Sequence, residues 1–91
     1  MVQWNASHIL VKSNANQILK QIKSGEYTFE EAAGMFSECP SGEDGGNLGW
    51  FGPGKMVPEF EEAVSKMKVG EISKPIKTRF GFHIIRLDDK K

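Results

Sequence analysis

The chain has 91 residues, of which 38% are hydrophobic and 26% are charged, and its twelve basic residues balance twelve acidic ones. This balance argues against a general binder of nucleic acids or anionic membranes, which needs a basic surface. The single cysteine cannot form an internal disulfide, no apolar run reaches the ~18 residues of a membrane-spanning helix, and the start lacks the pattern of a signal peptide. We therefore expect residues 1–91 to form a single cytoplasmic domain, monomeric, with no nucleic-acid partner and no membrane contact.

The first quarter of the chain predicts a strand followed by a helix. Residues 2–12 mix β-branched and aromatic residues and end apolar, which favours a strand. In the helix, Asn14 and Gln17 have the spacing of a capping box at the start, and Gly25 marks the end. The apolar residues between them recur at the spacing of one helical face, namely Ala15, Ile18, Leu19 and Ile22.

Two further helices are predicted. In the second, Thr28 and Glu31 match a capping box, and the apolar residues that share one face are Phe29, Ala32, Ala33 and Phe36. The third begins at Pro58, a residue suited to the first helical turn, and is expected to end at Gly70. Its predicted buried stripe consists of Phe60, Ala63, Val64 and Met67.

Six of the ten glycines fall within residues 42–54. This segment lacks the G-x-x-x-x-G-K-[ST] pattern of a phosphate-binding loop and carries Glu43 and Asp44, whose charge would repel phosphate. We interpret it instead as a tightly folded loop in which several glycines adopt positive φ. Strands are predicted at 48–51 and at 82–87. The resulting order, β-α-α-β-α-β, indicates an α+β domain with a small sheet.

The only two histidines, His8 and His83, both lie in strand-like runs. Because side chains alternate along a strand, both rings should point into the apolar layer, and they could hydrogen-bond to each other if the first and last strands pair. Three interpretations stay open: a structural pair of core histidines, a zinc site completed by Cys39, or a hydrolase with Cys39 as the nucleophile. No CxxC or HxxxH spacing supports zinc, and nothing local marks Cys39 as reactive.

Three blocks of sequence, in order and at domain-scale spacing, resemble the parvulin family of peptidyl-prolyl cis/trans isomerases. They are SHILVK, SECPSGEDGGNLGWFGPGKMVPEFEEAV and VGEISKPIKTRFGFHIIRL, and the resemblance runs from about Trp4 to Leu87. It implies a small four-stranded antiparallel sheet surrounded by helices in the order β-α-α-β-α-β-β. The additional short strand would lie around Ile76, in a segment that the pattern alone leaves as a connection.

The resemblance also implies a site. The catalytic residues would be His8, Cys39, Thr78 and His83, with Cys39 at a position where the family has cysteine or aspartate. The pocket for the substrate's proline ring would be formed by Leu48, Met56, Phe60 and Phe80. Rotation about an amide breaks no bond, so no metal and no cofactor are expected. The expected partners are proline-containing peptides and unfolded or flexible protein segments, whose folding the domain would assist.

Two positions depart from the family's pattern. Parvulins specific for phosphoserine or phosphothreonine before proline carry several basic residues after the first strand, whereas the segment VKSNANQ offers Lys12 alone. We therefore predict no preference for a phosphorylated residue. Asn47 stands where the family commonly has aspartate, a change expected to alter the charge of the loop but not the pocket.

Two other classes of function would fit the same pattern. A binding module or chaperone could hold proline-containing peptides in the same pocket without accelerating their isomerisation. A purely structural scaffold would bind no peptide, and substitutions of Met56 or Phe60 would then affect stability alone. Acceleration of cis/trans exchange distinguishes the isomerase from both.

Overall fold

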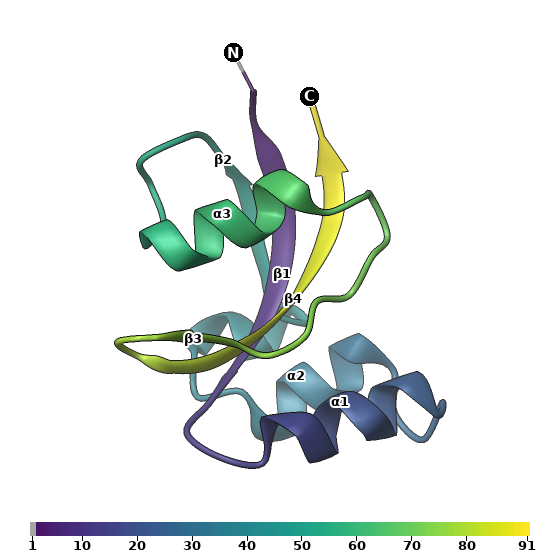
Figure 1. Ribbon diagram of the computed structural model, residues 1–91. Coiled ribbons are helices and arrows are strands. Elements are labelled where there is room, and N and C mark those ends of the chain that lie inside the picture. Colours follow the sequence, from purple (N-terminus) through teal and green to yellow (C-terminus); the bar gives the residue numbers. More distant parts are fainter. Residues whose placement is uncertain (1) are drawn as a thin grey trace.

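The computed structural model describes residues 2–91, which form one four-stranded antiparallel sheet, three α-helices and a short 3-10 helix. In chain order the elements are β1 (Trp4–Val11), α1 (Ala15–Lys23), α2 (Phe29–Phe36), η1 (Pro40–Asp44), β2 (Asn47–Phe51), α3 (Pro58–Lys66), β3 (Ile76–Thr78) and β4 (Gly81–Lys90). The strands lie in the order β2-β1-β4-β3. The α+β prediction is confirmed, including the additional short strand, β3. Figure 1 shows α3 lying across the central strands, with α1 and α2 together at the lower end of the molecule.

The register between β1 and β4 sorts their side chains onto two faces of the sheet. His8 lies opposite Ile85, and Leu10 lies opposite His83, so both histidines share one face. The core under α1 and α2, here called the α1–α2 core, consists of Ile9, Val11, Ala15, Ile18, Leu19, Ile22, Phe29, Ala32, Ala33 and Ile84. The core on the histidine side, the α3 core, consists of Trp4, Ala6, Phe51, Phe60, Val64, Met67, Ile85 and Leu87.

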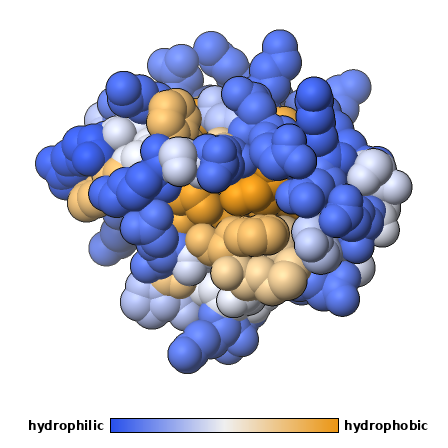
Figure 2. Space-filling model, turned by 90° about the horizontal axis from the view of Figure 1, so that it is seen from below, coloured by the Kyte–Doolittle hydropathy of each residue, from blue (hydrophilic) through white to orange (hydrophobic). Residues whose placement is uncertain are grey.

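The end of the molecule built by α1 and α2 keeps some apolar surface. Figure 2 views the molecule from this end and shows apolar side chains gathered near the middle, within a rim of hydrophilic ones. Met35 of α2 is 52% exposed and Phe36 is partly buried against the α1–α2 core. Within residues 2–91 no helix has both the length and the apolar character needed to cross a bilayer.

The two predicted capping boxes have different outcomes. At α2 the prediction is confirmed, because the Thr28 hydroxyl accepts from the Glu31 N–H at 3.0 Å and the Glu31 carboxylate accepts from the Thr28 N–H at 2.9 Å. At α1 it is wrong: Asn14 has a left-handed backbone conformation (φ 65°), and its side chain makes no capping bond. An N-cap side chain reaches the first turn from an extended backbone, which Asn14 does not have. The helix α1 is therefore held in place by the burial of its apolar face and not by a capping side chain.

The predicted end of the third helix at Gly70 is also wrong. α3 ends at Lys66, and Met67 already has an extended backbone (φ −88°, ψ 156°). The chain leaves the helix because the following residues bond to β4: the Gly70 N–H donates to the Leu87 carbonyl at 2.7 Å, and the Leu87 N–H donates to the Glu71 carbonyl at 3.1 Å. Met67 is nevertheless buried in the α3 core. The apolar spacing therefore correctly predicted that Met67 is buried, although the helix ends one residue earlier.

The glycine-rich loop fixes the backbone of His8. The His8 N–H donates to the Gly46 carbonyl at 2.9 Å, and Gly46 has a φ of 87°. A Cβ at Gly46 would lie 2.5 Å from the His8 carbonyl oxygen, so only glycine fits this approach. The prediction of a tight loop with several positive φ values is confirmed, since Gly45, Gly49 and Gly54 share this conformation. The short helix η1, which the pattern did not predict, begins this loop.

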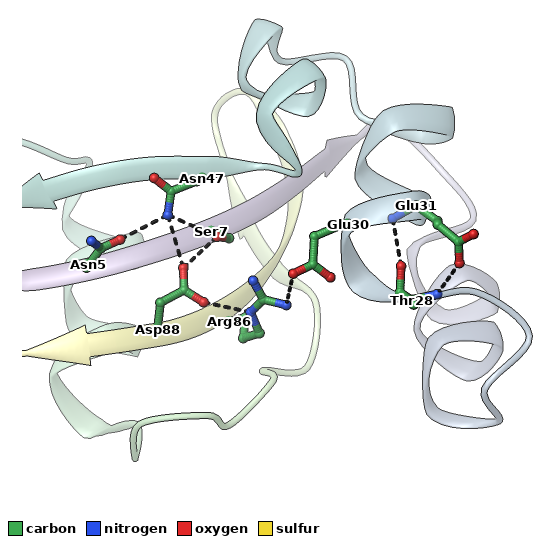
Figure 3. A network of polar contacts seen from close by, with 8 residues as sticks. All are labelled: Asn5, Ser7, Thr28, Glu30, Glu31, Asn47, Arg86 and Asp88. Carbon is green, nitrogen blue, oxygen red and sulfur yellow. Dashed lines mark hydrogen bonds and ion pairs between the residues drawn. The ribbon is translucent and has the colours of Figure 1, made fainter.

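A polar network that runs across β2, β1 and β4 explains why asparagine suits position 47 (Figure 3). The Asn47 amide donates to Asn5 Oδ1 at 3.0 Å and to Asp88 Oδ2 at 3.2 Å. The same Asp88 oxygen accepts from the Ser7 hydroxyl at 2.6 Å, and the other accepts from Arg86 Nε at 2.6 Å. An aspartate at position 47 would place a second carboxylate against Asp88, without a proton to donate. Asn47 is also absent from the lining of the pocket described below.

Candidate active site

A pocket of about 420 Å³ opens on the histidine side of the sheet. Four segments far apart in the sequence meet there: β1, the turn before η1 with β2, the start of α3 with the loop before it, and the β3–β4 hairpin. Seven of the eight residues predicted for the site line it, namely His8, Cys39, Leu48, Met56, Phe60, Phe80 and His83. The eighth, Thr78, lies behind the wall, where it is 5% exposed and contacts His83.

A chain of hydrogen bonds forms the floor of the pocket. The Nδ1 atoms of His8 and His83 are 2.9 Å apart, and His83 Nε2 is 2.8 Å from the Thr78 hydroxyl. The Thr78 oxygen also accepts from the Phe80 N–H at 3.1 Å. A bond between two Nδ1 atoms requires one protonated and one bare nitrogen, so the tautomers of the two rings are coupled. In one arrangement Thr78 donates to His83, which donates to His8; in the other every donor is reversed.

Burial keeps the two rings uncharged at neutral pH. Desolvation, and secondarily the neighbouring His83, lower the pKa of His8 from its ordinary 6.5 to about 4. Desolvation also lowers the pKa of His83, against an opposing effect of Glu59. Two neutral rings can share one proton in a hydrogen bond, whereas two cations at this distance would repel. The pair is therefore suited to shaping and polarising a site rather than to carrying charge.

Phe60 locks the floor from the α3 side. Its ring is 2% exposed and meets both imidazoles edge-on, with centroids 5.7 Å from His8 and 5.6 Å from His83. It also packs against Phe51 at 6.0 Å. Edge-to-face packing of this kind fixes ring orientation as well as contributing apolar contact. Because α3 carries Phe60, the helix positions both the core and the pocket floor.

Cys39 lies at the pocket wall and is partly exposed. Its sulfur accepts a hydrogen bond from the Ser41 hydroxyl at 3.3 Å, and its N–H donates to the Ser37 hydroxyl at 3.3 Å. Among residues 2–91 no hydrogen bond joins Cys39 to a histidine, which is the contact that activates a cysteine nucleophile. In the same residues no group of three His, Cys, Asp or Glu side chains is placed to hold a metal ion.

Four residues of the pocket lining were not predicted: Leu10, Lys55, Val57 and Arg79. Leu10 could have been found, because it lies two residues after His8 and so shares its face of the strand. Val57, Lys55 and Arg79 lie in loops, where no periodicity tells which way a side chain points. Only their sequence adjacency to Met56 and Phe80 hinted at a place in the pocket.

Comparisons with known proteins identify the family. Residues 5–89 match the family described as Rotamase, the PPIC-type PPIASE domain. The foldase protein PrsA of Geobacillus kaustophilus is 53% identical over 94% of this chain, and the match covers 31% of that protein. The chain thus spans about a third of the length of the curated relatives that it matches.

Two solved structures share the fold. The crystal structure of the peptidylprolyl isomerase PrsA from Bacillus anthracis superposes with a TM-score of 0.95 at 45% identity, covering 99% of this chain and 42% of that one. The solution structure of NmPin, the parvulin of Nitrosopumilus maritimus, gives a TM-score of 0.84 at 41% identity and covers 98% of both chains. The fold, the arrangement of the pocket and the match over residues 5–89 lead to one conclusion: the chain belongs to the PPIC-type family of peptidyl-prolyl cis/trans isomerases, the parvulins.

Proposed function

We propose that this chain, as a single isomerase domain, accelerates rotation about Xaa-Pro bonds in unfolded or flexible protein segments, without a covalent step and without a requirement for phosphate. The observation that carries the proposal is an apolar pocket whose floor is a buried, uncharged histidine pair. Such a pocket suits a proline ring, which is apolar and has no N–H to satisfy. Its volume of about 420 Å³ leaves room for the ring and part of the adjoining backbone.

The proposed reaction is rotation about an amide bond and requires no bond to be broken. The barrier to rotation about an amide is about 18–20 kcal/mol, and Xaa-Pro exchange in water takes tens of seconds or more. Catalysis requires the site to bind the twisted amide more tightly than either planar form. Leu48, Met56 and Phe60 hold the pyrrolidine ring while the preceding segment rotates against it. Poor solvation of the planar carbonyl in this apolar setting favours the twisted state, in which amide resonance is lost.

The polar groups have a supporting role in this mechanism. Cys39 faces the carbonyl that precedes the proline, and Phe80 closes the rim. His8, His83 and Thr78 keep the floor rigid through their chain of hydrogen bonds and tune the surroundings of Cys39. A covalent adduct with Cys39 is not needed, because rotation neither makes nor breaks a bond. The partner of the Cys39 sulfur is a serine hydroxyl and not a base.

Independence from phosphate is supported by the position of Lys12. Its Nζ donates to the Phe80 carbonyl at 3.0 Å, which ties it to the β3–β4 hairpin. The segment after β1 contributes no arginine, whereas phosphate recognition of this kind uses clusters of arginine. The one lysine that this segment offers to a preceding phosphate is therefore already engaged.

The test is proton exchange spectroscopy on Ala-Pro and Ser-Pro peptides, the latter with and without phosphate on serine. We expect catalytic amounts of the protein to produce cis/trans exchange with the unphosphorylated peptides, and phosphorylation to give no gain. Binding of these peptides without faster exchange would replace the isomerase by a peptide-binding module. A gain of tenfold or more on phosphorylation would overturn the phosphate-independent part alone.

A cytoplasmic location and a monomeric state stay predictions from composition. Cell fractionation with an antibody against the chain tests the first. Sedimentation equilibrium at micromolar concentration tests the second, for which a mass near the 10.1 kDa of the chain is expected. A mass near twice that value would contradict the prediction of a monomer.

A further inference from the structure

The strand β2 does not follow the regular alternation of side chains. Leu48 lines the pocket and packs against the α3 core, and Phe51 belongs to that core, so both side chains face α3. The two residues are three positions apart, and residues at an odd spacing in a regular strand point to opposite faces of the sheet. The alternation must therefore be interrupted between Leu48 and Phe51.

The interruption is a β-bulge at Gly49. Asn47 and Trp50 both pair with β1, and two residues, Leu48 and Gly49, lie between them. The opposing stretch of β1 has one residue, Ala6, so β2 carries one residue more than regular pairing allows. Gly49 has a φ of 74°, the left-handed conformation typical of glycine in such a bulge. A Cβ at Gly49 would meet no atom within 4 Å, so the backbone conformation, and not a lack of space, favours glycine here.

The side chain of Asn47 holds this bulge. Its Oδ1 accepts from the Gly49 N–H at 3.0 Å, so the side chain bonds to the backbone two residues later. Its amide nitrogen donates to Asn5 Oδ1 at 3.0 Å and to Asp88 Oδ2 at 3.2 Å. Figure 3 shows this nitrogen turned toward Asn5 and Asp88 and the Asn47 oxygen turned away from them. Because the nitrogen is fixed by two neighbouring strands, the oxygen stays directed at the bulge.

We propose that Asn47 is a positioning residue for the isomerase site: its Oδ1 fixes the bulge at Gly49 and thereby keeps Leu48 in the wall of the pocket. This inference rests on the proposed isomerase function and adds a residue that does not itself line the pocket. Phe51 is 6% exposed and packs against two aromatic rings of the α3 core, so its place is held by burial. When the bulge is released, Leu48 is therefore the side chain that turns away, and the pocket loses part of its apolar wall.

The proposal depends on the oxygen of Asn47 and not on its nitrogen. An aspartate at position 47 still presents an oxygen to the Gly49 N–H, although it loses the bonds that the nitrogen donates. An alanine presents no acceptor. Asn47→Asp should therefore keep Leu48 in place, whereas Asn47→Ala should not.

The test measures kcat/KM per folded molecule by exchange spectroscopy on an unphosphorylated Ala-Pro peptide, with the folded fraction taken from urea denaturation. We expect Asn47→Ala to lower kcat/KM by about three- to fivefold, as the partial loss of one apolar contact would give, and Asn47→Asp to keep the wild-type value. Thr28→Ala is the matched control. It also removes a side-chain acceptor 3.0 Å from a backbone N–H, but at the start of α2 and outside the pocket, and it should keep the wild-type kcat/KM.

A double-mutant cycle tests whether Asn47 acts through Leu48. Leu48→Ala removes the side chain that the bulge positions, so adding Asn47→Ala to it should lower kcat/KM no further. A purely structural role of Asn47 would lower the stability in both backgrounds but would not produce this dependence of kcat/KM on Leu48. A second loss in the double variant, equal to that in the wild-type background, would overturn the proposal, because Asn47 would then act by another route.

If Asn47→Ala does not fold, substitutions of Gly49 test the bulge instead. Gly49→Asn and Gly49→Val both add a side chain in open space, but asparagine adopts the left-handed conformation far more readily than a β-branched residue. Gly49→Asn should keep the wild-type kcat/KM, and Gly49→Val should lower it about as much as Leu48→Ala does. Equal kcat/KM values in folded Gly49→Asn and Gly49→Val would overturn the proposal.

The outcomes separate this inference from the proposed function. A wild-type kcat/KM in folded Asn47→Ala overturns the positioning role and leaves the isomerase intact. An equal loss in Asn47→Asp and Asn47→Ala also overturns it, because the oxygen acceptor would then not be the cause. Absence of exchange with the wild-type protein overturns the proposed function itself, and the positioning role with it.

Discussion

The two faces of one sheet serve different purposes in this molecule. On the α1–α2 side, an apolar core cluster without histidine lies beside a polar network that joins the buried Ser7 to Asn47, Asp88 and Arg86. On the α3 side, the core continues directly into the walls of a pocket and includes two buried histidines. The same alternation of side chains along β1 and β4 produces both faces.

This difference shows where stability has been exchanged for function. A buried imidazole with a lowered pKa is destabilising in acid, and His8 Nε2 has no hydrogen-bond partner among residues 2–91. An apolar residue at position 8 would avoid both costs. Both histidines lie on the face of the sheet that carries the pocket, and the other face has none. The following substitutions test that division, beginning with the largest expected effect.

Matched truncations on the two faces should separate stability from activity. Phe60→Ala should lower the free energy of unfolding by about 3–5 kcal/mol, and Ile9→Ala by about 2–4 kcal/mol. Both residues are nearly inaccessible, at 2% and 0% exposed. Urea denaturation measures the stability, and exchange spectroscopy measures the activity of the folded fraction. Only the Phe60 variant should lose activity per folded molecule, because Phe60 holds the floor of the pocket.

If Phe60→Ala does not fold, the activity can be measured with Phe60→Leu instead. It retains an apolar side chain but removes the ring that meets both imidazoles, so we expect a folded protein with reduced kcat/KM. An Ile9→Ala variant with equally reduced activity per folded molecule would remove the distinction between the faces.

Acidification should weaken the protein through the histidine face. Because the pKa values of His8 and His83 are lowered, the folded protein binds fewer protons than the unfolded chain between about pH 4 and 6.5. The free energy of unfolding is therefore fully retained above pH 6.5 and falls as pH decreases through this window. Urea denaturation at pH 7.5 and pH 5 should differ by about 2 kcal/mol.

His8→Gln tests the assignment of this pH dependence. The variant removes the ring whose lowered pKa accounts for the difference of about 2 kcal/mol, so the difference between pH 7.5 and pH 5 should shrink to the contribution of His83, whatever the variant's stability at pH 7.5. An undiminished difference would show that other groups cause the acid sensitivity.

Met56→Ala should affect activity more than stability. Met56 lines the pocket and is only partly buried, so its truncation removes the contacts proposed with the proline ring and few contacts with the core. We expect kcat/KM to fall about tenfold, equivalent to about 1.4 kcal/mol, and stability to change by less than about 1 kcal/mol. Met35→Ala, at an exposed position on α2, is the matched control and should keep wild-type kcat/KM.

Asn47→Asp should have the smallest effect, and only on stability. The new carboxylate would face Asp88 and lose the bonds that the amide donates to Asn5 and Asp88. A loss of about 0.5–1 kcal/mol in the free energy of unfolding is expected at neutral pH, with kcat/KM unchanged. A changed kcat/KM would mean that the polar network and the pocket are coupled through the sheet.

Much of this fold could be predicted from the sequence because its helices are strongly amphipathic. The four apolar positions of α1 are all buried, and the capping box of α2 forms as expected. The errors lie where tertiary contacts override local preference. Gly70 bonds to β4 and so cannot end a helix, and Asn14 adopts a left-handed turn instead of capping. The three-residue strand β3 is too short to leave a pattern and was predicted only through the family resemblance.

The site was predictable where it lies on regular elements. Alternation along β1 and β4 correctly placed His8 and His83 on one face, close enough to hydrogen-bond. Lys55 and Arg79 were not predicted, because each lies in a loop. They line the same pocket only after α3 and the β3–β4 hairpin have folded against it. Loop side chains of this kind have no periodicity by which to predict their direction.

The most direct test of rotation without a covalent step is cis/trans exchange with an unphosphorylated Ala-Pro peptide in the presence of the Cys39→Ala variant. The proposed mechanism predicts a folded variant that still accelerates exchange, with kcat/KM within about tenfold of wild type. A folded variant with no acceleration above the uncatalysed rate would contradict it, because the Cys39 sulfur would then be indispensable to a reaction attributed here to the shape and polarity of the pocket.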